Sequence, residues 1–160
     1  MRLFKLFVAI GLTAAAMFAS TAMARDLTGR LGVGFVNDFA IPVPAISVKY
    51  GLSKDLHWQG AMGFDTGDPA AFELGTKLYK NIFFETNLNF FMAGGLAYLR
   101  RSKSAFEVQG ILGAEFFIPG LESLGFLFEA GVSANNMKTS SFSLSTLGYS
   151  FFNAGMHFYF

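Results

Sequence analysis

Residues 106–118 read FEVQGILGAEFFI, a stretch in which large apolar residues alternate with small or polar ones. The two alternating sets are Phe106, Val108, Leu112, Phe116 and Ile118, and Glu107, Gln109, Gly113 and Glu115. Successive side chains of a β-strand point to opposite faces, so a period of two in hydrophobicity is typical of a strand. This stretch therefore predicts a strand with one large apolar face and one small or polar face.

The same alternation recurs along the chain and divides it into eight predicted strands. We place them at Leu27–Val36, Ala45–Gly51, Leu56–Asp65, Ala71 to about Phe84, Asn87–Leu99, Phe106–Ile118, Gly125–Asn135 and Leu147–Phe160. Two interpretations of Tyr79–Phe84 are open, namely a turn at Lys80 and Asn81 or a fourth strand that runs on to Phe84. We prefer the longer fourth strand, because the turn would leave a fifth strand of about 18 residues, far above the usual length.

Composition indicates which medium the apolar faces meet. Of the 160 residues, 52% are hydrophobic and 14% are charged, whereas about 25% are charged in an ordinary soluble domain. The polar faces hold too many of the 18 glycines and too few charges for a surface in water. We therefore predict that the apolar faces meet lipid and the polar faces line a narrow lumen. The predicted fold is all-β, an eight-stranded antiparallel up-and-down transmembrane β-barrel, with a soluble periplasmic β-sandwich as the structural alternative.

Residues 1–24 have the three parts of a secretory signal peptide. Arg2 and Lys5 supply the positive start, Leu6 to Phe18 form a short apolar core, and Ala22-Met23-Ala24 provides a small-x-small cleavage site. We expect cleavage after Ala24, which leaves residues 25–160 as the barrel, exported to the bacterial outer membrane.

The predicted connections also alternate, and this orients the barrel. The even-numbered ones are Leu52–Asp55, Phe84–Thr86 and Pro119–Leu124. The odd-numbered ones are Asn37–Pro44, Thr66–Ala70, Arg100–Ala105 and Asn136–Thr146. Bacterial barrels have short periplasmic turns and longer outer loops, so we expect the even set in the periplasm. Phe39 to Pro44 and Phe142 would then leave apolar groups on outer loops, where they touch a partner or the lipid headgroups.

The last six residues, Gly155-Met156-His157-Phe158-Tyr159-Phe160, resemble the insertion signal of bacterial outer-membrane proteins. In that family a final aromatic residue, preceded by alternating apolar residues, is read by the barrel-assembly machinery, which implies roles for Gly155, Phe158 and Phe160. The segments around 87–98 and 113–131 are similar to the small barrels that include OmpA-like, OmpX-like and OmpW-like domains. The resemblance implies a Gram-negative cell-envelope protein and leaves the subfamily open.

Charged residues on the predicted lumen face are the main candidate site. They are Arg30, Lys49, Glu73, Lys77, Glu107, Glu115 and Glu129. Charges in a confined lumen are costly unless they are paired, and an eight-stranded lumen is just wide enough for side chains to fill. We favour a salt-bridge network that blocks the lumen over a charged path for a small solute.

Three cations, Arg100, Arg101 and Lys103, cluster in one outer loop. They are candidates for contact with the phosphates of lipopolysaccharide, and a solvated loop is an equally good interpretation. Outer-membrane lipid is thus an expected partner. The net charge of +1 gives no basic patch for nucleic acid, and we expect a monomer.

Catalysis finds little support in the sequence. Cysteine is absent, and we predict no catalytic, cofactor-binding or metal-binding residue. His57 and His157 are interpreted as lumen fillers, since the clustered serines 140, 141, 143 and 145 lie toward the opposite end. The tripeptide Asp65-Thr66-Gly67 occurs once, whereas aspartic proteases need two such aspartates, so it is interpreted as a loop turn.

The expected function is therefore a structural or surface-binding membrane barrel and not an enzyme. A narrow OmpW-like channel for small or apolar solutes is the first alternative. A lipid-modifying enzyme is the second.

Overall fold

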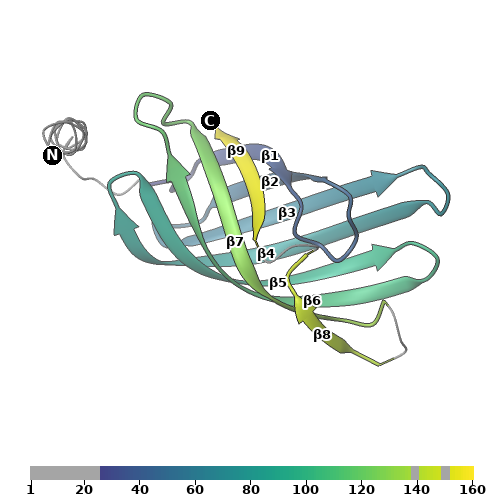
Figure 1. Cartoon of the computed structure of the whole chain (residues 1–160). Helices are drawn as coiled ribbons and strands as arrows, with labels where there is room; N and C mark the ends of the chain where they lie inside the picture. The colour runs from purple at the N-terminus through teal and green to yellow at the C-terminus, as the bar shows by residue number, and fades with distance from the viewer. Residues whose placement is uncertain (1–25, 138–140, 149–151) are drawn as a thin grey trace, which may run out of the picture.

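The predicted strands form in the computed structural model, which describes residues 26–137, 141–148 and 152–160. The predicted signal peptide lies outside these residues. Nine strands are present in the described ranges (Figure 1). They are β1 (Leu31–Val36), β2 (Ala45–Gly51), β3 (Leu56–Asp65), β4 (Ala71–Glu85), β5 (Leu88–Arg100), β6 (Ser104–Phe117), β7 (Leu124–Asn135), β8 (Ser143–Thr146) and β9 (Asn153–Tyr159). The same residues contain no helix long and apolar enough to cross a membrane.

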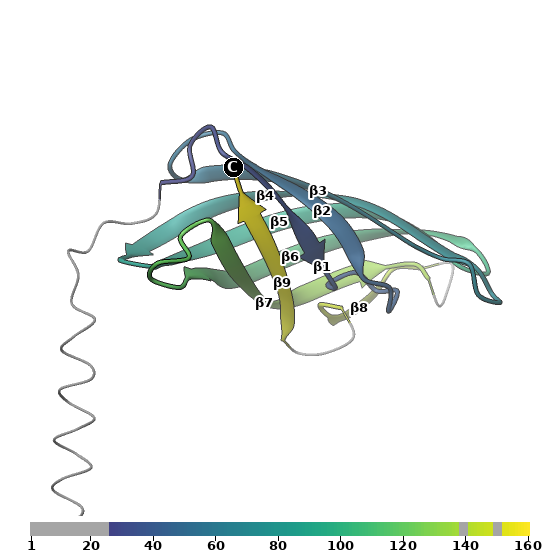
Figure 2. The same ribbon diagram turned by 90° about the horizontal axis from the view of Figure 1, so that it is seen from above.

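All neighbouring strands pair antiparallel, and the sheet closes on itself (Figure 2). β1 pairs with both β2 and β9, and β7 pairs with β6 on one side. On its other side β7 pairs with β9 along 124–129 and with β8 along 132–135, so β8 and β9 share one position in the wall. The predicted eight-stranded antiparallel barrel is therefore confirmed.

Two strand predictions are corrected. The predicted eighth strand, Leu147–Phe160, begins only at Asn153 as β9, because Gly148 adopts a positive φ of 61° and Asn153 Nδ2 donates to Leu147 O at 3.0 Å. The rest of this wall position is β8, which lies in the predicted outer loop Asn136–Thr146. The first strand begins at Leu31 and not at Leu27, because Gly29, with φ 74°, makes a turn. Positive φ is accessible to glycine at low cost, which explains both interruptions.

The strand faces have the chemistry that the alternation predicts. Side chains inside the barrel are largely polar or small, whereas large apolar side chains such as Phe64, Leu96 and Phe158 are exposed on the outer surface. Lys49 and Lys77, by contrast, are only 1–2% exposed. A few large apolar residues, such as Phe91, Leu99 and Leu127, are buried inside. A protein folded in water rarely exposes so many large apolar side chains while it buries lysines.

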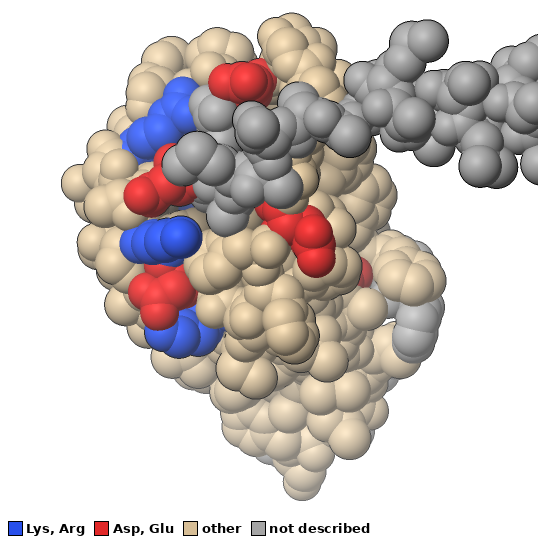
Figure 3. Space-filling view, turned by 90° about the vertical axis from the view of Figure 1, so that its left-hand side faces the viewer, with Lys and Arg blue, Asp and Glu red and all other residues tan. Residues whose placement is uncertain are grey.

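The two ends of the barrel differ. One end, here the turn end, carries the short connections 52–55, 86–87 and 118–123 together with the described chain ends. The opposite loop end carries 37–44, 66–70, 101–103 and the described residues 136–137 and 141–142. Charged side chains of both signs gather along one edge of the turn end (Figure 3). There the Lys80 ammonium and the Ser53 hydroxyl both bond to the Asp55 carboxylate, which lowers its pKa to about 2.

Candidate functional site

The lumen nearest the turn end holds one buried ion pair with an aromatic partner. Lys49 Nζ of β2 lies 2.7 Å from Glu115 Oε2 of β6, and the Tyr159 hydroxyl donates to Glu115 Oε1 at 2.5 Å. Lys49 Nζ also lies 4.4 Å from the centre of the Tyr79 ring, within cation–π range. Both oxygens of Glu115 and the ammonium therefore have partners, as burial of such charges requires.

A second ion pair fills the middle of the lumen. Lys77 Nζ of β4 lies 2.8 Å from Glu129 Oε2 of β7 and also pairs with Asp38. The Tyr79 hydroxyl lies 2.8 Å from both Glu129 Oε1 and Gln59 Oε1. With the Gln59 amide turned over, its nitrogen donates to Tyr79 and Tyr79 donates to Glu129, which accounts for both contacts of the one hydroxyl. Because Tyr79 contacts both ion pairs, the two form one continuous polar network.

The connection from β1 to β2, residues 37–44, folds into the lumen at the loop end, and we call it the plug loop. Phe39 and Ile41 are 1% exposed and Val43 8%. The prediction that these apolar residues face outward is therefore wrong. A Cβ at Gly75 would overlap the Phe39 ring, so this glycine leaves the space that the ring occupies.

Polar contacts hold the plug loop to the strands. Besides the Asp38–Lys77 pair, Gln109 Nε2 donates to Asp38 O at 3.0 Å. The backbone N–H of Ala40 donates to Glu107 Oε2 at 3.1 Å. One salt bridge and two hydrogen bonds thus hold the plug loop to β4 and β6. The sequence predicted that the lumen charges pair with one another, whereas Lys77 and Glu107 also bind this loop.

The other two predicted lumen charges lie outside this network. Glu73 is buried, and neither carboxylate oxygen has a hydrogen-bond partner among the described residues. Arg30 lies at the mouth of the turn end, where its guanidinium donates to Tyr159 O at 3.0 Å and Ser123 Oγ at 3.3 Å. Arg30 Nε also donates to Phe160 O at 3.4 Å, so Arg30 ties the start of β1 to the end of β9.

The structure contains a serine–histidine contact that sequence reasoning missed. Ser47 Oγ of β2 lies 2.7 Å from His157 Nε2 of β9, although 110 residues separate them. Both side chains are fully buried, and His157 Nδ1 has no partner in the described part of the chain. A serine nucleophile needs access to substrate and a base oriented by a third group. This pair has neither, and His57 is likewise buried. The signal was the shared inward direction of residues 47 and 157. It does not specify that both residues pair with Gly34 of β1, one on each side.

The remaining candidate residues lie on the surface. Arg100, Arg101 and Lys103 are exposed at the loop end, where Arg101 N donates to Lys103 O at 3.2 Å. Phe158 of β9 and Phe160, which follows that strand, are exposed with ring centres 5.2 Å apart. Asp65 Oδ1 accepts the Gly67 N–H at 2.9 Å within its own loop.

Gly155 lies against β1, since a Cβ there would be 2.8 Å from Phe35 O.

No group of three or more His, Cys, Asp or Glu within residues 26–137, 141–148 and 152–160 is arranged to hold a metal ion.

Eight antiparallel strand positions, with the ion pairs inside and large apolar side chains exposed outside, close into a small β-barrel. The crystal structure of the N-terminal β-barrel domain of Pseudomonas aeruginosa OprF is similar, with a TM-score of 0.52 at 12% sequence identity. The similarity covers 82% of this chain and 96% of that one. No family model and no curated protein sequence matches the chain. The comparison at this identity shows the shared fold.

Proposed function

We propose that this chain is a small integral barrel of the Gram-negative outer membrane, with a structural or surface-binding role and a lumen closed by its own side chains. One observation carries the proposal: two ion pairs are buried inside, while large apolar side chains cover the outside. In water, such a surface would drive association, because contiguous exposed apolar patches rarely exceed a few hundred Å² on soluble monomers. A lipid environment removes this cost and explains the inverted arrangement.

Blocked conduction follows from the plug loop and the polar network. The lumen is filled at the loop end by Phe39, Ile41 and Val43, and in its middle by Lys77 and Glu129. An eight-stranded lumen has little more room than its own side chains need. The arrangement therefore supports a scaffold more than the narrow channel that is the main alternative.

Fractionation and gel migration test the membrane placement. We expect the protein in the detergent-insoluble outer-membrane fraction, with a band that migrates differently after boiling, as a closed barrel does when it unfolds. A soluble periplasmic band with no heat-dependent shift would overturn the proposal and favour a sandwich.

Planar bilayer recordings test the closed lumen. We expect no steady unitary conductance from the wild-type barrel. Regular conductance steps would favour the channel alternative. Transfer of acyl chains from labelled lipid A or phospholipid would instead favour a lipid-modifying enzyme.

A further inference from the structure

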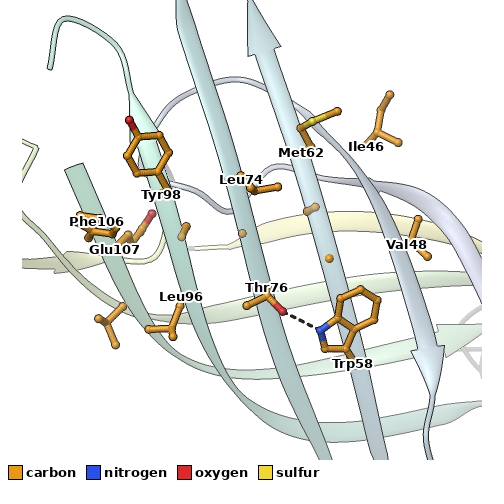
Figure 4. A pocket seen from close by; sticks show the side chains of 15 residues that line it. Ile46, Val48, Trp58, Met62, Leu74, Thr76, Leu96, Tyr98, Phe106 and Glu107 are labelled. Atoms are coloured by element: carbon orange, nitrogen blue, oxygen red, sulfur yellow. Dashed lines mark hydrogen bonds between the residues drawn. The ribbon is translucent and has the colours of Figure 1, made fainter. Parts of the chain in front are cut away.

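The outward face of β2 to β6 is not a smooth apolar wall but carries a groove near the loop end (Figure 4). Its volume is about 800 Å³, and it is lined by apolar side chains that include Val48, Leu74 and Phe106. Trp58 Nε1 donates to Thr76 Oγ1 at 2.8 Å, and Thr76 Oγ1 donates to Gln59 O at 3.1 Å. The indole and hydroxyl groups of Trp58 and Thr76 therefore have partners, and the largely apolar surface of the groove suits a hydrocarbon ligand.

Small residues extend this depression toward the middle of the barrel. Gly94 of β5 and Gly110 of β6 are direct partners in the sheet, and both line a hollow of about 460 Å³. Gly94 also lines a second hollow of about 400 Å³, which shares Trp58 and Thr76 with the groove. A Cβ at Gly94 would meet no atom closer than 4.0 Å, and at Gly110 none closer than 3.9 Å. Packing within the protein therefore does not require glycine there. The hollows keep open space on the outer surface.

The loop end of the groove is capped by positive charge. Leu96, Tyr98 and Arg100 follow one another on the same face of β5, and Leu96 and Tyr98 line the groove. Arg100 lies one two-residue step beyond Tyr98, about 7 Å along the strand. Arg101 and Lys103 follow in the adjoining turn. Two carboxylates lie in or beside the neighbouring 66–70 loop, those of Asp65 and Asp68. Against the three cations they leave a positive net charge at this end of the groove.

An apolar groove beneath a cationic cap matches an amphiphile with several acyl chains and more than one phosphate. The groove extends over five strands, four spacings of about 4.8 Å, so it is about 19 Å wide. Together with the hollows of about 400 and 460 Å³, the groove offers more room than the two chains of a phospholipid need. A zwitterionic headgroup carries a single phosphate, which is too little negative charge to pair with all three cations.

We infer that this groove and its cationic cap form a binding site for lipid A, with acyl chains in the groove and phosphates at Arg100, Arg101 and Lys103. The inference rests on the proposed membrane placement, which sets the loop end at the outer leaflet. It goes beyond that proposal because it assigns a specific lipid to one part of the wall.

Trp58 is the single tryptophan of the chain and lines the groove, so it reports on the occupant. The barrel is refolded into vesicles of phosphatidylcholine with brominated acyl chains, which quench tryptophan on contact. Unlabelled lipid A is then titrated in, beside phosphatidylglycerol as the two-chain anion and dephosphorylated lipid A as the uncharged analogue. We expect lipid A to restore the fluorescence at a lower mole fraction than either control lipid.

Variants separate the cap from the groove. The triple change Arg100→Gln, Arg101→Gln and Lys103→Gln should weaken the competition by about fivefold per cation removed. The double change Gly94→Leu and Gly110→Leu fills the hollows and should also weaken it. The matched control is Lys80→Gln at the turn end, which should leave the competition unchanged.

The outcomes distinguish the two proposals. Absence of quenching by brominated phosphatidylcholine alone means that Trp58 does not face lipid, and then both the membrane placement and the lipid site fail. Quenching that lipid A relieves no better than phosphatidylglycerol leaves the membrane placement intact and overturns the lipid A site. Equal competition in the triple variant and the wild type overturns the cationic cap, and with it the site as stated.

Discussion

Replacing Lys77 by Met should destabilise the barrel by about 3–5 kcal/mol, the cost of removing one partner from a buried ion pair. Lys77 is the cation for both Glu129, at 2.8 Å, and Asp38 on the plug loop. All three side chains are at most 2% exposed, so no water replaces the lost ammonium. The variant therefore leaves two buried carboxylates without their shared partner.

Lys80→Met is the matched control, because Lys80 lies on the same strand and also pairs with a carboxylate, that of Asp55. The two side chains of that pair are 54% and 42% exposed. Exposed pairs contribute about 0–1 kcal/mol, since water and salt screen them. The two variants remove the same charge from the same strand, so their difference isolates the effect of burial.

Urea unfolding from vesicles, followed by Trp58 fluorescence and heat-dependent gel migration, measures both variants. For a slope of about 2 kcal/mol per M, Lys77→Met should lower the unfolding midpoint by about 2 M and Lys80→Met by less than about 0.5 M. Adding Asp38→Asn and Glu129→Gln to Lys77→Met should recover most of the loss, because no unpaired charge then remains. Equal midpoints for the two single variants, or no recovery in the triple variant, would refute the buried network.

Two further predictions concern the plug and the turn end. Gly75→Ala should lower the free energy of unfolding by about 1–3 kcal/mol, because its Cβ overlaps the ring of Phe39. Gly94→Ala, whose Cβ meets open space, should change it by no more than about 0.5 kcal/mol. The urea unfolding midpoints of the two variants test this difference. The pKa of Asp55 is about 2 in the folded chain, below its ordinary value, so its pair with Lys80 stabilises the fold above about pH 4 and is lost as the pH falls through about 2. Asp55→Asn should therefore lose less stability than the wild type between pH 4 and pH 2, and parallel curves would contradict this.

Local alternation was sufficient to predict most of the barrel. The predicted bounds Ala45–Gly51 and Leu56–Asp65 coincide with β2 and β3, and the fourth strand continues through Lys80 and Asn81 as preferred. In these segments one face meets the lumen and the other the outside, so the period of two is set by the environment of the strand itself. Such a signal needs no knowledge of distant residues.

The inward direction of the plug loop could not be predicted from alternation along its own segment. It depends on the room that the side chains of other strands leave inside the lumen. A clue did exist in the inward positions near the loop end, which are unusually small: Ala45, Ala61, Ala71, Ala97 and Ala105. Five alanines on five neighbouring strands leave a space that close packing must fill. Their alignment follows from the register of the whole sheet, which the sequence alone does not specify.

The contact between Ser47 and His157 was missed for the same reason, since it joins the second strand to the last. The split of the eighth position was missed because Ser143–Thr146 has only one large apolar residue, Leu144, and shows almost no alternation. Polar strands that pair with one neighbour give little periodic signal.

The position of the plug loop in the chain constrains the order of assembly. It connects β1 to β2, and β1 also forms the seam with β9, where Phe35 faces Met156 across more than a hundred residues. The segment that occupies the interior is thus continuous with the strand that joins the two ends of the sheet. Closure of the wall and filling of the interior therefore depend on one short stretch of chain, residues 31–44.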